Sequence, residues 1–168
     1  ARIALPPVMN YLRVWDVAAA DFIDTQMLVT RLVHGQFVVL GEKHDNPDHH
    51  RLQAWLLDAL ITAGRRPAVG FEMFDTDDAP AIARHLAAAP TDAVGLAEAV
   101  NWSQRGWPDW AMYQPIAEVA LAQQLPIVAT NFPATLTQAL MHAGTTALDA
   151  ALVQRLDLSR SLAAETYA

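Results

Sequence analysis

Three short apolar runs alternate with helical patterns along the chain, and we expect them to be the strands Phe37–Leu40, Val69–Phe71 and Ile127–Ala129. Each run is rich in β-branched or aromatic residues, as is typical of strands buried on both faces of a parallel sheet. Strands separated by helices and short loops build a doubly wound layer. The pattern therefore predicts an α/β fold: a parallel sheet flanked by helices on both faces, in three layers, with these runs as adjacent buried strands.

Helix signals fill the intervals between the runs. Asp24 or Thr25 caps a helix that ends at Gly35, and a second helix begins near Asp48, after Asn46-Pro47, and ends at Gly64. Spacing on the second helix predicts one buried stripe, made of Leu52, Trp55, Leu56, Ala59 and Leu60. Further helical patterns start near Thr91, Pro115, Asn131 and Leu148, and 12–17 with 22–23 could pair as a small hairpin.

Composition narrows the class of protein. A chain of 168 residues suits a single domain with a sizeable core. A net charge of −7 with only eleven lysines and arginines argues against a nucleic-acid surface. The absence of cysteine excludes disulfides and thiolate metal sites, and no apolar run approaches the roughly 18 to 20 residues that span a bilayer. No signal segment is visible. Residues 159–168 look like the start of a helix, so we expect the natural protein to continue.

Ionisable side chains gather directly after the first apolar run. Gly41 ends the run, and Glu42, Lys43 and His44 follow; Lys43 is the only lysine in the chain. Glu42 and His44 are two residues apart, so they point to the same side of an extended backbone. In parallel α/β folds, ligands bind at the carboxyl ends of the strands, so we expect a functional site at the end of this strand.

Other residues could converge on the same edge. Glu72 lies at the end of the second run, and His49 and His50 begin the next helix. Glutamate and histidine together suit a hard or borderline metal, or an acid–base pair. The plainer alternative is that the acids cap a helix while the histidines are solvated.

An aromatic stretch spans residues 102–113. For Trp102, Trp107 and Trp110 we expect packing between helices. Tyr113 lies near a proline at the start of a helix, from which its oxygen could point outward.

Four ordered motifs carry a family resemblance. In order and spacing, the chain resembles the bacterial haem-binding lipoproteins of the ChaN family at four motifs: LGEKHDNPDHHRLQ, FEMFD, GWPDWAMYQPI and PIVATNFP. That family belongs to a superfamily shared with the Tiki proteases and the erythromycin esterases. The resemblance covers roughly residues 12 to 168. Members usually carry a further C-terminal helical portion, and we expect the sequence given to lack that portion or to include only its first turns. The resemblance implies one haem-binding α/β domain over residues 1–168, with a small helical portion.

The resemblance implies haem binding and transfer in bacterial iron acquisition, by an outer-membrane or periplasmic lipoprotein. In the family, two haems stack inside a homodimer, a tyrosine of each subunit ligates iron, and a histidine and a lysine of the other subunit hold the propionates. For this chain, that implies haem b, a homodimer and an outer-membrane haem receptor as ligand and partners. The matching motifs give Lys43 the propionate role, with His44, His49 and His50 as the histidine candidates. Tyr113 is the expected iron ligand, with Tyr167 in reserve and Tyr11 less favoured.

The chemistry of these groups agrees with haem carriage. A tyrosinate is a hard anionic donor for ferric iron, and propionates are held by charge-assisted hydrogen bonds from cations. The wider superfamily suggests the alternative, a metal-dependent hydrolase or protease that uses Glu42, His44 and Glu72. We expect a haem-binding protein rather than an enzyme.

Overall fold

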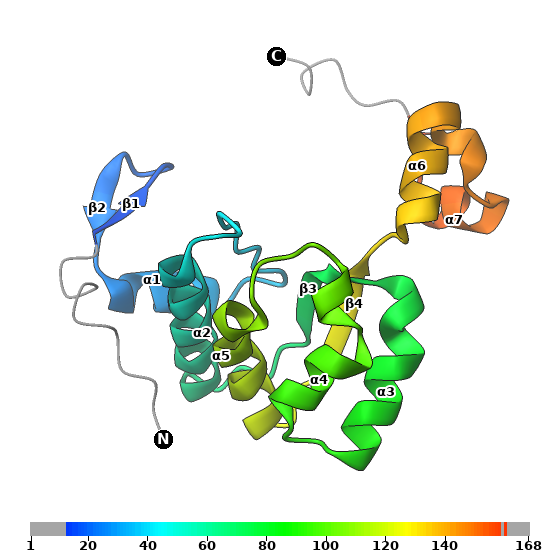
Figure 1. Ribbon diagram of the computed structural model, residues 1–168. Coiled ribbons are helices and arrows are strands. Elements are labelled where there is room, and N and C mark those ends of the chain that lie inside the picture. Colours follow the sequence, from blue (N-terminus) through cyan, green and yellow to red (C-terminus); the bar gives the residue numbers. More distant parts are fainter. Residues whose placement is uncertain (1–12, 159, 161–168) are drawn as a thin grey trace.

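A computed structural model describes residues 13–158 and 160. Its central sheet pairs β3 (Val69–Asp75) with β4 (Ile127–Asn131) in parallel, with Val69 opposite Ile127 and Phe71 opposite Ala129. In Figure 1, α2 and α5 lie together on one side of these strands and α3 on the other. The predicted α/β class and the adjacency of the second and third runs are confirmed.

The described part of the chain contains seven α-helices. They are α1 (Thr25–Leu32), α2 (Pro47–Thr62), α3 (Ala79–Ala88), α4 (Ala93–Ala99), α5 (Trp110–Ala122), α6 (Ala134–Ala143) and α7 (Ala150–Arg155). Three 3₁₀ turns join them: η2 (Thr76–Asp78), η3 (Trp102–Gln104) and η4 (Gly144–Ala147). Figure 1 shows α6 and α7 set apart from the sheet, at the end of the segment that follows β4. None of the helices in residues 13–158 is long and apolar enough to cross a membrane.

The predicted hairpin is present. β1 (Val14–Asp16) pairs antiparallel with β2 (Asp21–Ile23), and the rings of Trp15 and Phe22 meet edge to face across it. Asp24 caps α1 as expected, because its side chain accepts a hydrogen bond from the Met27 N–H.

The expected strand Phe37–Leu40 was wrong. These residues are irregular, and the side chains of Phe37 and Val39 are 82% and 91% exposed. Strand-forming residues become a strand only when a neighbour supplies a ladder, because β propensity reflects packing against adjacent strands. In the described part of the chain, β3 pairs with β4. The Leu40 carbonyl accepts a hydrogen bond from the Gln53 side chain of α2 instead of from a neighbouring strand.

The core lies between α2, α5, α4 and the sheet. Leu56 and Leu60 of the predicted α2 stripe are buried, whereas Leu52, Trp55 and Ala59 are only partly covered. The buried side of α2 also includes positions that the pattern did not select, namely His50, Ala54 and Leu57. The α2 helix thus carries a buried histidine in its first turn.

Trp102 and Trp110 are buried in this core, as predicted. Their indole N–H groups donate to the carbonyls of Pro108 and Ala93. Trp107 is partly buried and packs against the same cluster. These bonds satisfy the polar edge of each buried indole, which is how a tryptophan-rich core avoids a desolvation penalty.

Candidate functional site

The loop at residues 41–46 is folded back onto the first turn of α2. Asn46 caps the helix by accepting from the Asp48 N–H, and Pro47 occupies the first helical position. The Lys43 N–H donates to Nδ1 of His49 at 2.9 Å, and the Asn46 N–H donates to the Lys43 carbonyl. His49 therefore serves as a backbone anchor for the loop.

Glu42 is the centre of a polar network beneath the loop. Its side chain is 8% exposed, and Oε1 lies 2.9 Å from both His44 Nδ1 and the Tyr113 hydroxyl. Oε2 lies 3.7 Å from Nδ1 of His50. Burial alone would raise the pKa of Glu42, but hydrogen bonds from His44, Tyr113 and Gln53 outweigh it and lower the pKa below the ordinary 4.5. The carboxylate is therefore charged at neutral pH.

His50 is fully buried beside that carboxylate. Its Nε2 lies 3.1 Å from the His44 carbonyl, so Nε2 carries the hydrogen. Burial lowers its pKa below 6.5, against the opposing attraction of Glu42. Nδ1 has no hydrogen-bond partner in the described structure. His50 is neutral, and the alternative in which the histidines are all solvated is wrong for this one.

Tyr113 projects from α5 into the same interior. Its ring packs edge-on against His50, with centroids 4.1 Å apart, and its side chain has no exposed surface. The hydroxyl donates to Glu42, with a longer contact to the His44 carbonyl. Burial, then the hydrogen bond and charge of Glu42, then the charge of Glu72 raise its pKa above 10.0. The expectation that its oxygen points outward was wrong, because a charged carboxylate in the interior binds it.

The outer side of the loop has a different character. The Lys43 side chain is 73% exposed and lies 3.5 Å from Asp45, which is also exposed. The His44 side chain is 42% exposed, and its ring meets Trp107 edge-on at 5.0 Å. Phe37 and Val39 in the preceding segment are exposed as well, so segment 37–44 presents both apolar side chains and the Lys43 ammonium to solvent.

Glu72 does not join the Glu42 network. Glu72 is exposed on β3, and among the described residues no hydrogen bond joins it to Glu42 or His44, although its charge acts on Tyr113. Across residues 13–158 and 160, no group of three or more histidines and carboxylates could hold a metal ion. Of the expected hydrolase set, the structure brings together Glu42 and His44. The residues of the expected haem set lie in the loop or beside it: Lys43, His44, His49, His50 and Tyr113. Tyr11 and Tyr167 lie outside the described residues.

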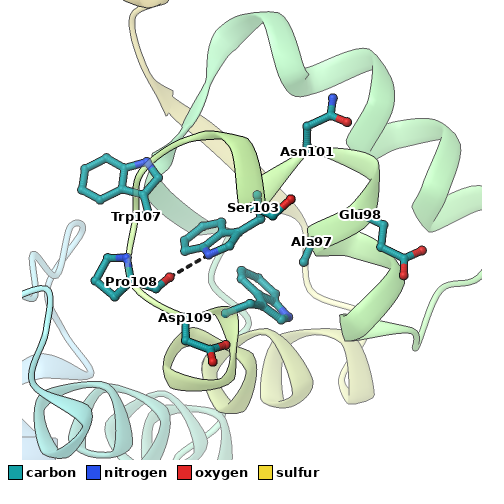
Figure 2. Close-up of a pocket in the computed structure, with 9 residues that line it drawn as sticks. Ala97, Glu98, Asn101, Ser103, Trp107, Pro108 and Asp109 are labelled. Atoms are coloured by element: carbon teal, nitrogen blue, oxygen red, sulfur yellow. Dashed lines mark hydrogen bonds between the residues drawn. The ribbon is translucent and has the colours of Figure 1, made fainter.

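A surface hollow of about 620 Å³ is lined largely by the aromatic stretch, and Figure 2 shows its lining. The carboxylates of Glu98 and Asp109, the side chains of Asn101 and Ser103, and Trp107 border it. No lysine, arginine or histidine lines it. Because its charged groups are negative, this hollow is a poor site for a dianion, and the loop at 41–46 is the better candidate.

Sequence reasoning missed the bond between Glu42 and Tyr113, which are 71 positions apart. No local pattern predicts such a contact; only the packing of α2 against α5 creates it. The burial of His50 had a weak signal, since it precedes Ala54 and Leu57 at helical spacing.

Comparisons with known proteins identify a similar fold and a family. A solved structure described as cofacial heme binding to ChaN of Campylobacter jejuni has a similar fold, with a TM-score of 0.67 and 21% identity. The similarity covers 78% of this chain and 53% of that one, so the chain spans about half the length of that protein. No curated protein matches the chain. The family model described as haem-binding uptake, Tiki superfamily, ChaN matches residues 28–168, and the chain belongs to that family.

Proposed function

We propose that this chain binds haem and passes it on during bacterial iron acquisition. The observation that carries the proposal is the surface of segment 37–44. It joins exposed apolar side chains, Phe37 and Val39, to the chain's only lysine and a half-exposed histidine. Haem has the matching character, with an apolar ring and two anionic propionates.

The residues present fit such a ligand. Lys43 can give a propionate a charge-assisted hydrogen bond. Among the described residues, its ammonium is paired with Asp45 alone, and such an exposed pair contributes little. The exposed side chains of Phe37 and Val39 offer apolar contact to a flat ring. In a chain of net charge −7, an accessible lysine at this place favours an anionic ligand.

We also propose the ligand, the assembly and the location of this protein. They are haem b as the ligand, a homodimer that encloses two haems, and a lipoprotein in the periplasm or at the outer membrane that receives haem from a receptor. Support comes from family membership and from the similar ChaN structure, whose description refers to cofacial heme. The exposed apolar segment 37–40 suits a surface that a second subunit covers.

Ligation of iron by Tyr113 stays a prediction, and the geometry weighs against it. Its hydroxyl has no exposed surface, donates to Glu42, and has a raised pKa, whereas a ligand must be a reachable tyrosinate. Tyr167, the reserve ligand, lies outside the described residues. The alternative, a metal-dependent hydrolase that uses Glu42, His44 and Glu72, has less support, because in the described part of the chain no group of three or more histidines and carboxylates could hold a metal ion.

Titration of hemin into the purified chain tests the proposal. We expect saturable binding with a protein-dependent visible spectrum, and a shift from monomer to dimer in sedimentation as haem is added. Hydrolysis that depends on an added divalent metal, without uptake of hemin, would contradict haem carriage and favour the hydrolase.

A further inference from the structure

We propose that α2 preorganises segment 37–44 for haem, with His49 and Gln53 as positioning residues that hold the backbone of the segment and do not themselves bind the ligand. The inference rests on the proposed function and deepens it. It gives a role to polar residues in the first two turns of α2 that the proposed function does not use. It also leaves the propionates to Lys43 and the half-exposed His44.

Segment 37–44 needs support from outside because it is irregular. It forms no strand, and the side chains of Phe37 and Val39 are exposed, so neither a sheet ladder nor burial of these two side chains holds it. Backbone of this kind is fixed only where its N–H and C=O groups find other partners. Without such partners, the segment would lose conformational freedom each time a ligand binds, which weakens binding.

Two side chains of α2 supply partners at two separate points of the segment. The Gln53 side-chain amide donates to the Leu40 carbonyl at 3.2 Å, and Nδ1 of His49 accepts from the Lys43 N–H at 2.9 Å. His49 and Gln53 are four residues apart, so they lie on one face of the helix, one turn from each other. A single helix face therefore binds both ends of the stretch from Leu40 to Lys43.

Further contacts fix the turn that follows. The Lys43 carbonyl accepts from the N–H of Asn46, the residue that caps α2, and the His44 carbonyl lies 3.1 Å from Nε2 of the buried His50. Both backbone groups of Lys43 are thus bound, while its side chain extends into solvent. The main chain of the segment is held, and the side chains that we assign to the ligand are left accessible.

This arrangement sets the positions of the ligand-binding groups relative to one another. Phe37 and Val39 precede the bond at Leu40, and Lys43 carries the bond to His49. The apolar side chains and the ammonium therefore project from one supported stretch of backbone. Because preorganisation raises affinity by removing the cost of ordering, haem affinity should depend on α2 side chains that never touch the haem.

The first test uses the protein without haem. Amide hydrogen exchange, followed by NMR, reports whether the Lys43 N–H is bound. His49→Ala should speed the exchange of this N–H about ten-fold, because its acceptor is lost. His49→Asn should keep the exchange slow, because the asparagine oxygen can accept in place of Nδ1. Equal exchange of the Lys43 N–H in the wild type and in His49→Ala would overturn the inference.

The second test uses hemin, at a temperature at which circular dichroism shows every variant to be folded. His49→Ala and Gln53→Met should each weaken hemin binding about five-fold, whereas His49→Asn should bind like the wild type. His85→Ala is the matched control, because His85 also binds a backbone group, the Asp92 carbonyl, from α3 on the other side of the sheet. The control should leave hemin binding unchanged. Wild-type affinity in His49→Ala and Gln53→Met would overturn the inference.

A cycle with Lys43→Ala separates positioning of the lysine from a general structural effect. If His49 acts by holding Lys43, adding His49→Ala to Lys43→Ala should weaken hemin binding by less than about two-fold. Fully additive losses would show that His49 does not act through Lys43 and would overturn its role. If the wild type takes up no hemin, the proposed function fails, while amide exchange still decides whether α2 holds the segment.

Discussion

Replacing Tyr113 with phenylalanine isolates one hydrogen bond in the interior. The substitution keeps the ring against His50 and Trp102, whose centroids lie 4.1 and 4.9 Å away, and removes only the hydroxyl that donates to Glu42. A hydrogen bond to a charged group contributes about 1.5–3 kcal/mol. Glu42 retains His44 as a donor, so we expect a loss of about 2 kcal/mol in the free energy of unfolding, toward the lower part of that range.

Thermal and urea unfolding of both proteins measure this loss. A domain of this size loses roughly 2–4 °C in Tm per kcal/mol, so the variant should melt about 4–8 °C lower. Glu42→Gln and the double variant complete a cycle, in which two contacting residues should show a coupling of about 0.5–3 kcal/mol. A loss below about 0.5 kcal/mol, as at an ordinary surface site, would refute the reasoning.

Alkaline pH supplies an independent check on the same residue. The pKa of Tyr113 is raised in the folded protein, so the unfolded chain loses this proton first as the pH rises. Stability from this group is therefore full below pH 10.0 and falls above it. The fall should be weaker in Tyr113→Phe; equal slopes in the two proteins would mean that Tyr113 is not a buried donor.

Three further predictions concern pH, the core and the loop. The pKa of His50 lies below 6.5 in the folded protein, so the unfolded state binds this proton first as the pH falls. We therefore expect the free energy of unfolding to fall as the pH drops below 6.5, and to fall less steeply in His50→Gln. Parallel curves of urea midpoint against pH for the two proteins would contradict this. Arg105 contacts Asp78 and the Val100 carbonyl, so Arg105→Lys should cost roughly 1.5–3 kcal/mol in chemical unfolding, and an unchanged midpoint would exclude a role in stability. Lys43→Ala should weaken hemin binding about ten-fold, equivalent to 1.4 kcal/mol, without changing stability, whereas Lys43→Arg should retain most of the affinity; equal affinities in the titration would remove Lys43 from the site.

Local signals predicted most of the elements. The Asp24 cap, the start of α2 after Asn46-Pro47, the hairpin and the strand runs Val69–Phe71 and Ile127–Ala129 all follow from residue types and spacing. These features depend on contacts within a few residues, or on a pattern that repeats through one element. They could be predicted because the physical cause lies in the stretch of sequence that forms them.

The failures arose where a distant partner decides. Phe37–Leu40 has strand-forming residues, but a strand also needs a neighbour, and the Leu40 carbonyl bonds to α2 instead. Tyr113 was expected to face outward because its local surroundings allow it. Glu42, far away in sequence, binds its hydroxyl in the interior. The polar residues of the site could be selected from the sequence, but their burial and hydrogen-bond partners could not.

Hemin titration of a loop variant tests the central claim most directly. The variant combines Lys43→Ala with His44→Ala. Its matched control combines Arg84→Ala with His142→Ala, which likewise removes one cationic residue and one histidine, here from exposed positions on α3 and α6. We predict that the wild type and the control bind hemin saturably, at one haem per chain, and that the loop variant binds at least ten-fold more weakly. Equal binding by the loop variant and the control, or no saturable binding by the wild type, would contradict the account.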